Sequence, residues 1–402
     1  MSDFVPEGWL LSEAEELYSR MRVPQVYDRN LVDQSGKYPV LDQSENGCVG
    51  YLNSKPEFEC SPSSPLTTFA NHTCAVRQMT RSFGVIQNVF PLKAKAHVSQ
   101  EFLFQILKGA IPQNGYKGHY PDLREKLFLT PPLPEQQKIA TILSSVDDVI
   151  EKTHAQIDKL KDLKTGMMQE LLTKGIGHTE FKDSPVGLIP AAWEVTHLGA
   201  VVMPKGIQTG PFGSQLHAHE YVDWGVPVVM PRDMKGNKID PASVSHIPLE
   251  RAVELDKHRV EVNDFLFARR GDIGRFALVD KSNEGWVCGT GCLKVRMKPS
   301  VNPIFMASYL TLKPVIEWLN LNAVGQTMLN LNTSILSDLP VVLPSEQEQT
   351  IIGEAIVSLD NKVALSSAKL DSLQIVKKAL MQDLLTGKVR VKLSELDTEA
   401  AN

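Results

Sequence analysis

The chain contains one long internal repeat, and this repeat limits its possible folds more than any other feature of the sequence. The segment MQELLTKG at 168–175 returns as MQDLLTGK at 381–388. Aligning residues 139–176 with residues 352–389 needs no gap, and 12 of the 38 aligned positions are identical. The fold must therefore contain the same long element twice.

Both copies have the hydrophobic spacing of a helix that pairs with another helix. Their apolar residues alternate three and four positions apart, which is the heptad pattern of a coiled coil. The polar interruptions also coincide, since Thr153 aligns with Ser366 and Lys164 with Lys377. Because polar groups in a seam fix its register, this match favours pairing of the two helices with each other over two separate amphipathic helices. The expected pairing residues are Ile139, Val146, Ile157, Leu160, Ile352, Leu359, Leu370 and Leu373.

The ends of the two helices are repeated as well. LPEQQK at 133–138 and LPSEQEQ at 343–349 precede the copies. Gly175 and Gly387 stand near the exits, where a left-handed C-terminal cap favours glycine. At about 1.5 Å per residue, a helix of about 37 residues is roughly 55 Å long. Such a pair would act as a spacer of defined length.

A second repeat divides the rest of the chain into two globular domains. VPEGW at 5–9 and IPAAW at 189–193 each place a tryptophan three residues after a proline. The polar, glycine-rich segment at 175–187 has the composition of a boundary. Short apolar runs separated by turn residues predict mixed α/β domains. The expected parts are a first domain (1–132), a central helical region (133–177), a second domain (178–342), a distal helical region (343–392) and a disordered tail (393–402).

The fold class that follows is α+β, with two mixed α/β domains joined by two long paired helices. Antiparallel pairing would place the domains at opposite ends of a rod and relate them by a pseudo-twofold axis, whereas parallel pairing would place both at one end. The residues leave this choice open. An antiparallel pair would hold two reading heads at a fixed separation, which suits a twofold-symmetric partner such as duplex DNA.

Composition narrows the class of protein. The chain has 402 residues and a net charge of -5, so any site for a polyanion must be a local patch. The N-terminus has no signal-peptide pattern, and no apolar run approaches about twenty residues, so we expect a cytoplasmic protein without a membrane segment. Five cysteines do not form a disulfide framework, and CGTGC, which ends at Cys292, lacks a second ligand pair for zinc. We expect reduced thiols and no metal site.

The sequence lacks the motifs of several enzyme classes. It has no GxGxxG after a strand, no GxxxxGK[ST] phosphate loop, and no Asn/Asp-Pro-Pro-aromatic tetrad of N-methyltransferases. PDLREK at 121–126 does not have the spacing of a magnesium-dependent nuclease centre. We therefore expect no catalytic residues in this chain.

Several motifs together resemble the specificity subunits of type I restriction-modification systems. PPLPEQQKIATILSSVDDVI followed by FKDSPVGLIPAAWEV resembles the central conserved region of that family, and LPVVLPSEQEQ with MQDLLTGK resembles its distal conserved region. GIQTGPFGSQL, VNDFLFARRGDIGR and GQTMLNLNTSIL resemble one type of second recognition domain, while KYPVLDQSENGCVGY and HTCAV resemble a first-domain type. One feature departs from the repeat. The second copy has three more residues between the proline of PSEQEQ and its helix than the first copy has between the proline of PEQQ and its helix. The second helix start therefore need not match the first.

The resemblance implies a non-catalytic, DNA-binding subunit of a host-defence complex. Each of two target recognition domains would read one half of a split double-stranded DNA target, and antiparallel helices would set the gap and dock two modification subunits. Those subunits use S-adenosylmethionine to methylate adenine, and restriction subunits join them to translocate and cut DNA. This chain itself would hold no cofactor.

Candidate DNA contacts follow from donor and acceptor chemistry. Arg, Lys, Asn and Gln read base edges in the major groove, and phosphates accept hydrogen bonds from basic side chains, hydroxyls and backbone N–H groups. The candidates in the second domain are Gln208, Thr209, Ser214, Gln215, Arg232, Arg269, Arg270, Arg275, Gln326, Asn330 and Asn332. The candidates in the first domain are Ser44, Asn46, Arg77, Arg81, Lys117, His119, Tyr120 and Arg124.

These candidates also have structural explanations. The glycines of GIQTGPFGSQ at 206–215 can simply permit a tight turn, the arginines of ARRGDIGR can pair with Asp272, and Asn332 can cap a helix. His119 alone would more often be a histidine without a binding role.

Two other functions fit parts of the sequence. A coiled-coil scaffold that binds proteins and no DNA agrees with the near-neutral charge, but its binding would respond weakly to salt, whereas DNA binding weakens steeply with salt. A chain that cleaves DNA itself would nick it in the presence of magnesium.

Overall fold

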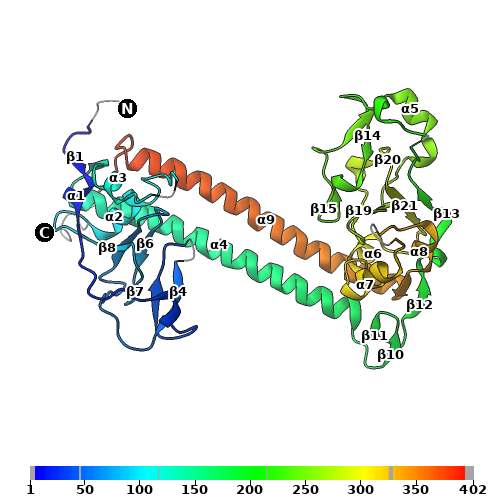
Figure 1. The fold of residues 1–402 in the computed structure, drawn as a ribbon, viewed down its shortest axis with the longest axis horizontal. Helices are drawn as coiled ribbons and strands as arrows, with labels where there is room; N and C mark the ends of the chain where they lie inside the picture. The colour runs from blue at the N-terminus through cyan, green and yellow to red at the C-terminus, as the bar shows by residue number, and fades with distance from the viewer. Residues whose placement is uncertain (1–4, 45–46, 116, 214, 326–328, 394–402) are drawn as a thin grey trace. The chain divides into compact units, whose positions relative to one another are not determined.

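The computed structural model describes residues 5–44, 47–115, 117–213, 215–325 and 329–393. The chain divides into two compact units, residues 1–155 with 367–402, and residues 156–366. Two long helices, α4 (Leu133–Thr173) and α9 (Glu346–Leu384), each supply one segment to each unit (Figure 1). Each unit therefore contains a globular part and half of each helix.

The two helices run antiparallel in both units. In the first unit Lys377 of α9 donates to Asp147 of α4, and in the second unit Lys164 of α4 donates to Asp360 of α9 at 2.5 Å. Residue numbers rise along one helix as they fall along the other, as antiparallel pairing requires. The contacts within each unit thus resolve the choice that the sequence left open, and the predicted pairing of the two helices is confirmed.

The apolar seam of the helices is turned away from solvent. Ile139 packs in the core of the first unit and Ile352 in that of the second, so the first turns of each helix also serve the globular parts. Thr153, one of the two polar interruptions, is buried and donates to Val149 O of its own helix at 2.7 Å. Among the expected pairing residues, Ile139, Ile157, Ile352, Leu359 and Leu370 are buried, and Val146, Leu160 and Leu373 are half-buried.

The globular part of the first unit is a mixed α/β domain of short elements. Its elements are β1 (Leu10–Glu13), α1 (Ala14–Leu17), β2 (Tyr18–Arg20), β3 (Tyr38–Leu41), β4 (Cys48–Leu52), β5 (Leu66–Ala70), β6 (Val76–Met79), β7 (Gly84–Val85), β8 (Val89–Ala94), α2 (Gln100–Leu107), α3 (Tyr120–Arg124) and β9 (Leu127–Thr130).

The second unit has the same kinds of elements with several additions. They are β10 (Phe181–Ser184), β11 (Gly187–Pro190), β12 (Glu194–His197), β13 (Val202–Thr209), β14 (Val226–Val229), β15 (Met234–Lys235), β16 (Lys238–Ile239), β17 (Ser245–Ile247), α5 (Leu249–Glu254), β18 (Phe265–Ala268), β19 (Phe276–Leu278), β20 (Val287–Cys288), β21 (Cys292–Met297), α6 (Pro303–Tyr309), α7 (Lys313–Asn322), α8 (Thr333–Asp338) and β22 (Pro340–Leu343).

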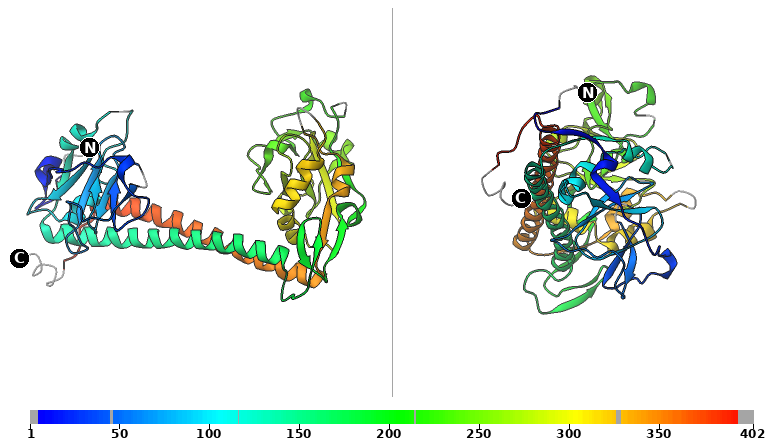
Figure 2. Two further views of the ribbon diagram at one scale, coloured as in Figure 1. Left: turned by 60° about the horizontal axis from the view of Figure 1, so that its bottom comes forward. Right: turned by 90° about the vertical axis from the view of Figure 1, so that its left-hand side faces the viewer.

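The two globular parts share one topology although their sequences show little similarity. The four-stranded sheet has the order β2-β8-β5-β6 in the first unit and β13-β21-β18-β19 in the second. Figure 2 shows strands and short helices in each globular part. The three-stranded sheets, β4-β3-β7 and β17-β14-β20, each combine one antiparallel and one parallel pair. The register also agrees, because Phe69 lies opposite Phe90 just as Phe267 lies opposite Leu293. The repeat therefore extends from the helices into the domains.

In the first unit, the tryptophan motif, a helix start and a helix exit meet in one cluster. Trp9 Nε1 donates to Glu135 at 3.3 Å, and Arg390 Nε donates to the same carboxylate at 2.9 Å. Gly387 has a φ of +68°, and a Cβ at this position would collide with Pro6. We call these residues the first clamp.

The second unit repeats this arrangement with one change of chemistry. Trp193 Nε1 donates to Glu348 at 3.1 Å, and His178 Nε2 lies 3.0 Å from the same carboxylate, in the place of the arginine. Gly175 has a φ of +66°, and a Cβ here would lie 2.7 Å from the Trp193 ring. These residues form the second clamp, and both predicted glycine caps are confirmed.

The two helices also begin in the same way. Gln136 Nε2 donates to Pro131 O at 2.8 Å, and Gln349 Nε2 donates to Pro344 O at 3.0 Å. Pro131 is therefore the counterpart of Pro344. The expectation that the second start is three residues longer is wrong, because it compared Pro344 with Pro134, which lies within the first turn of α4.

All five cysteines are free thiols, and Cys292 is buried with its Sγ 3.3 Å from Val229 O. Within the described ranges, no three or more His, Cys, Asp and Glu side chains are placed to hold a metal ion. None of the helices in the described part of the chain is both long and apolar enough to cross a membrane. Residues 394–402 of the expected tail lie outside the described residues.

Candidate functional site

Loops at one end of the two sheets carry most of the candidate residues of the second unit. β13, β14, β18 and β20 end on this side and β21 begins there, as the antiparallel and parallel pairings require. Arg269 N donates to Gly291 O at 2.8 Å, and Gly210 N donates to Cys292 O at 2.9 Å. Motifs that are far apart in the sequence therefore form one continuous surface.

Arg269 is the centre of this surface. Its Nε donates to Asn330 Oδ1 at 3.1 Å, and its guanidinium lies 5.8 Å from the centre of the Phe212 ring. Phe212 is 53% exposed and was not among the candidates, although an aromatic residue inside a glycine-rich loop is a signal that could have found it. Arg270 is exposed, and within the described residues its side chain has no hydrogen bond or ion pair. An aromatic ring, an amide and two arginines thus share one small area.

A groove of about 490 Å³ in the same unit is lined in part by the cationic side chains of Arg232, Lys235 and Arg275 and also by Asp272. Arg275 donates to Asp272 at 2.9 Å, so Arg275 forms the internal ion pair that was the structural alternative to a DNA contact. Arg232 donates to Ser245 Oγ at 2.9 Å while its side chain stays 67% exposed. The groove can contact phosphates without being strongly basic.

Three other candidates of the second unit support their own loops. Gln208 Nε2 donates to Lys205 O at 3.0 Å, and Gln215 Oε1 accepts from the backbone N of Phe212 at 3.1 Å. Asn332 Oδ1 accepts from Ile335 N at 2.8 Å, which makes Asn332 the N-cap of α8. Asn332 therefore has the helix-capping role that was the structural alternative to a DNA contact.

Thr209 lies above a buried pair of basic residues that the sequence did not indicate. His258 is 5% exposed and hydrogen-bonds to the Thr209 backbone. Burial is the main cause that lowers the pKa of His258 to about 4, and the charges of Lys257 and Lys294 lower it further. Lys294 is also 5% exposed and donates to Lys257 O at 2.9 Å and Arg259 O at 2.8 Å. A neutral His258 therefore supports the end of β13.

The first unit has equivalent loops at the same end of its sheets. Asn71 N donates to Asn88 O at 2.9 Å, and Asn88 has a φ of +66°. Gln43 accepts from His72 N at 2.9 Å through Oε1 and from Thr73 Oγ1 at 2.6 Å through its carbonyl. Gln43, Thr73 and Asn88 were not candidates, although two of them stand in the DQSENG and HTCAV motifs. Asn71 is the counterpart of Arg269, since Asn71 N bonds to Asn88 O as Arg269 N bonds to Gly291 O, and Gln43, Thr73 and Asn88 add amides and a hydroxyl to the loops at this end.

Ser44 and Arg77 meet at the turn that follows β3. Arg77 donates to Asp42 O at 3.1 Å and to Ser44 O, and burial lowers the pKa of its guanidinium. Ser44 Oγ donates to Asp42 Oδ1 at 2.6 Å. Arg77 thus secures the turn that carries Ser44. Arg81 is exposed and has no side-chain partner among the described residues.

The KGHYPDLR segment at 117–124 does not form one open cluster. Lys117 pairs with Asp122 at 2.8 Å, and His119 is fully buried with its Nδ1 3.3 Å from the same carboxylate. Tyr120 packs among aromatic rings of the core, and Arg124 pairs with an acidic residue of α1 at 2.5 Å. The candidates Asn46, Ser214 and Gln326 lie outside the described residues.

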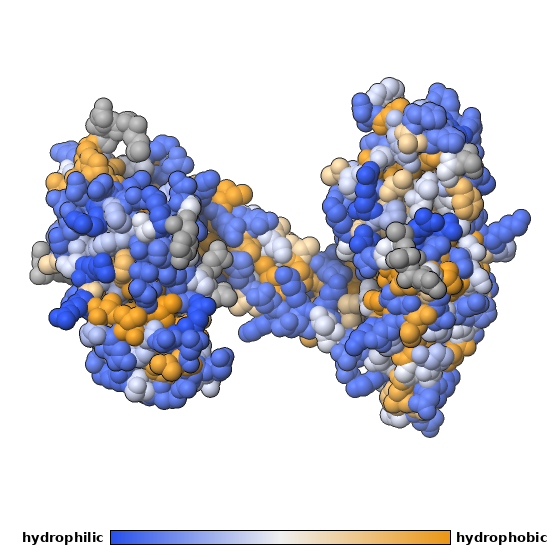
Figure 3. All heavy atoms as spheres, in the orientation of Figure 1, coloured by the Kyte–Doolittle hydropathy of each residue, from blue (hydrophilic) through white to orange (hydrophobic). Residues whose placement is uncertain are grey.

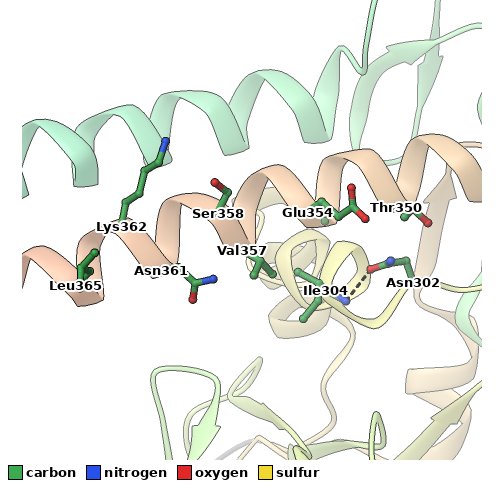
Figure 4. Close-up of a pocket in the computed structure, with 10 residues that line it drawn as sticks. Asn302, Ile304, Thr350, Glu354, Val357, Ser358, Asn361, Lys362 and Leu365 are labelled. Atoms are coloured by element: carbon green, nitrogen blue, oxygen red, sulfur yellow. Dashed lines mark hydrogen bonds between the residues drawn. The ribbon is translucent and has the colours of Figure 1, made fainter.

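A groove beside the long helices occurs at equivalent positions in both units. In the second unit Asn302 and Ile304, at the start of α6, face Val357 and Leu365 of α9 across it (Figure 4), and its volume is about 560 Å³. The first unit has a groove at the corresponding place. Its lining residues on α4 align, through the sequence repeat, with lining residues on α9, and the others lie at the start of α2. The full lining is Ser99, Glu101, Gln137, Ala140, Thr141, Ser144, Ser145 and Asp148. The groove thus has a more apolar lining in the second unit than in the first.

Known proteins of one kind are similar to this chain over most of its length. The type I restriction modification DNA specificity domain matches residues 225–374. The chain is 31% identical over 315 residues to a protein of Methanocaldococcus jannaschii named as the type I restriction enzyme MjaX specificity subunit, covering 76% of this chain and 69% of that one. It is 30% identical over 283 residues to the MjaVIII specificity subunit of the same organism, covering 68% and 65%.

A solved structure has a similar fold. The S subunit of a type I restriction-modification system from M. genitalium aligns with a TM-score of 0.61 and covers 98% of each chain. Only 16% of the residues are identical, so this likeness concerns the fold alone.

Proposed function

The chain belongs to the specificity subunits of type I restriction enzymes, and from this premise we propose that its two units each read one half of a split DNA target. Its role is DNA recognition within a larger enzyme, and this role is non-catalytic. The comparisons give no support to a scaffold that does not bind DNA. We propose the cytoplasm as its location, because that is where the DNA of a bacterial or archaeal cell lies.

One observation carries the proposal of two half-sites. Both units place loops at the same end of the same pair of sheets, but the side chains on these loops differ completely. The first unit presents Gln43, Thr73 and Asn88, and the second presents Arg269 and Asn330. Amides and arginines are the groups that distinguish base pairs in the major groove. Equal frames with unequal side chains suit two unlike half-sites.

The exposed cations would hold the phosphates on either side of the bases. Arg81 and Arg270 are exposed without an ion pair among the described residues, and Arg232 lies in the cationic groove. Phosphate contacts set orientation and give the salt dependence of binding, whereas the amides and Arg269 would give sequence preference.

The paired helices would set the unread gap and bind the partner subunits. Apolar surface is visible along the helices (Figure 3), and Leu163, Leu365, Ile375 and Val376 are at least half exposed there. Exposed apolar surface of this kind marks a protein interface. The equivalent grooves beside the helices support two modification subunits, one for each unit. We propose that they methylate adenine with S-adenosylmethionine, which they and not this chain would bind, and that restriction subunits complete the complex.

Mapping methylated adenines across the genome tests this function. The source strain with the gene intact should methylate one split motif, and deletion of the gene should remove methylation from that motif alone. An unchanged methylation pattern after deletion would contradict the assignment, provided that the modification subunit is expressed in both strains.

A double variant tests the division between the units. Arg269→Ala with Arg270→Ala should weaken recognition of one half-site by about 1–3 kcal/mol per lost base contact and leave the other half unchanged. Binding of purified variant to duplexes altered in either half measures this. The matched control is Lys313→Ala, since Lys313 lies on α7 and its side chain is 87% exposed. Equal losses at both halves would refute the division.

A further inference from the structure

An exposed apolar patch lies on the second unit, at the end of its three-stranded sheet away from the candidate DNA loops. Trp224 is 84% exposed, Leu249 61%, Val253 60% and Val222 39%, and we call these four residues the Trp224 patch. A hollow of about 570 Å³ opens between Trp224, Leu249 and their neighbours. The patch precedes β14 and follows β17, whereas the DNA loops follow β14 and precede β17. It therefore belongs to a different face of the domain.

The backbone holds the exposed tryptophan in a defined connection around the end of β17. Val222 pairs with His246 on one edge of β17, whereas Val226 and Pro227 pair with Ile247 and His246 on the other edge, so residues 223–225 wrap around the end of this strand. Gly225, within this connection, has a φ of +148°, and a Cβ here would collide with Ile247 O. The tryptophan is thus presented by paired backbone on both sides and not by a loose loop.

The first unit shows that the fold does not require a tryptophan here. Asp33 and Pro39 pair with Tyr51 on its two edges, so the sequence QSGK forms the equivalent connection around the end of β4. All four residues of QSGK are exposed, and none is apolar. An exposed tryptophan costs solubility without contributing to the core, so Trp224 points to a binding function.

The charge around the patch identifies the kind of partner. Residues 220–226 and 249–257 contain five carboxylates and two cations. Arg251, one of the cations, is already paired with Glu220 at 2.6 Å and with Glu254. DNA phosphates would be repelled, and a second copy of this chain would bring like charges together. A basic protein surface with an apolar side chain is complementary.

We propose that the Trp224 patch binds a partner protein through a basic segment that places an apolar side chain in the hollow. Because the first unit lacks both the tryptophan and α5, the chain binds this partner at one place only. The patch thereby distinguishes two units that are otherwise built on one plan. This site is separate from the helix grooves at which we place the modification subunits.

Photocrosslinking in the source strain tests the proposal with the full-length chain. Benzoylphenylalanine replaces Val253, which leaves Trp224 in place, and the adducts formed in irradiated cells are mapped by mass spectrometry. We expect a protein adduct whose crosslinked peptide contains Lys or Arg next to an apolar residue. Benzoylphenylalanine at Ser35, in the equivalent connection of the first unit, should give no such adduct.

Two substitutions make the test specific. Glu250→Lys and Trp224→Ser should each lower the yield of this adduct about tenfold, whereas Glu59→Lys in the first unit should not change it. An adduct with DNA, an adduct with a second copy of the chain, or a yield that both substitutions leave unchanged would each overturn the proposal. DNA binding by Trp224→Ser should remain at the wild-type level, which shows that the variant is folded.

Discussion

The two units have the same frame and differ in what the frame carries. Both have a clamp in which a tryptophan and a basic side chain (Arg390 or His178) meet one glutamate, and both join the helices by a lysine–aspartate pair. Above this frame the corresponding positions diverge. Pro91 of β8 lies opposite Thr68, the residue before Phe69. The buried Lys294 of β21 lies opposite Leu266, the residue before Phe267, so Pro91 is the counterpart of Lys294.

This difference separates two kinds of constraint. In each clamp a buried tryptophan donates to a glutamate that is buried (Glu135) or half-buried (Glu348), so a change in one leaves the other unpaired and costs stability. The loop side chains contact the backbone of their own loops or solvent, so they can change without affecting the frame. A frame that tolerates new loops is what a family of readers with many targets needs.

The largest test of the equal frames is removal of the clamp tryptophans. Trp9→Ala and Trp193→Ala should each lower the free energy of unfolding of their own unit by about 4 kcal/mol, because each side chain is nearly fully buried. Urea titrations read by hydrogen exchange resolve the two units. Trp224→Ala is the control and should change stability by less than about 0.5 kcal/mol. If one clamp tryptophan is tolerated, the two clamps are not equivalent.

A second test compares the ion pairs between the helices. Lys377 is 12% exposed and Asp147 25%, whereas Lys164 is 30% and Asp360 52% exposed. Lys377→Met should therefore cost about 2 kcal/mol and Lys164→Met about 0.5 kcal/mol, both measured by urea unfolding. Methionine keeps the apolar stem, so only the charge is tested. Equal costs would show that burial does not distinguish the pairs.

Asp147 explains the direction of this difference. Burial acts to raise the pKa of its carboxyl, but hydrogen bonds from Lys377 and Gln105 hold the pKa below its ordinary value. Removing Lys377 leaves the buried carboxylate with Gln105 and with Lys108 at 3.5 Å. The remaining contacts limit the loss to less than that of an isolated buried charge.

The third test concerns pH and the second unit alone. His258 has a pKa of about 4 against an ordinary value of 6.5, so between these values the unfolded chain binds a proton that the folded chain does not. Stability therefore falls as the pH decreases through this window, by about 3 kcal/mol. His258→Gln should remove this part of the pH dependence. Unfolding of both proteins at several pH values measures it, and the first unit serves as an internal reference.

Equal pH profiles for wild type and His258→Gln would contradict this account. In the first unit, where the counterpart of Lys294 is a proline, hydrogen exchange should show the same dependence of stability on pH in wild type and in His258→Gln.

The sequence predicted the helices because a heptad is a local and repeated signal. It also contained an unused signal for their direction. Lys164 aligns with Lys377 and Asp147 with Asp360, so parallel pairing in register would oppose like charges, whereas antiparallel pairing joins each lysine to an aspartate. Local pattern and charge together were enough to determine the pairing.

The candidate site was much less predictable, because burial depends on contacts between distant segments. Tyr120 and His119 have the chemistry of a DNA contact, but α3 packs them against the core. Phe212, which is exposed, and Asn88, which is half-buried, become neighbours of polar loops only when the strands align their ends. Residue type can suggest a contact, but strand order decides which residues reach the surface together.

The smallest expected effects come from the exposed arginines, and they would sharpen the comparison of the two reading surfaces. Arg81→Ala and Arg270→Ala should each weaken DNA binding about threefold to tenfold and should make the dependence on salt shallower by about one phosphate contact. Stability should stay within about 0.5 kcal/mol of wild type, since neither side chain has an ion pair among the described residues. Binding at several salt concentrations to duplexes with either half-site scrambled assigns each arginine to one half. If Arg81→Ala acts through the same half-site as Arg270→Ala, the two units do not read separate parts of the target.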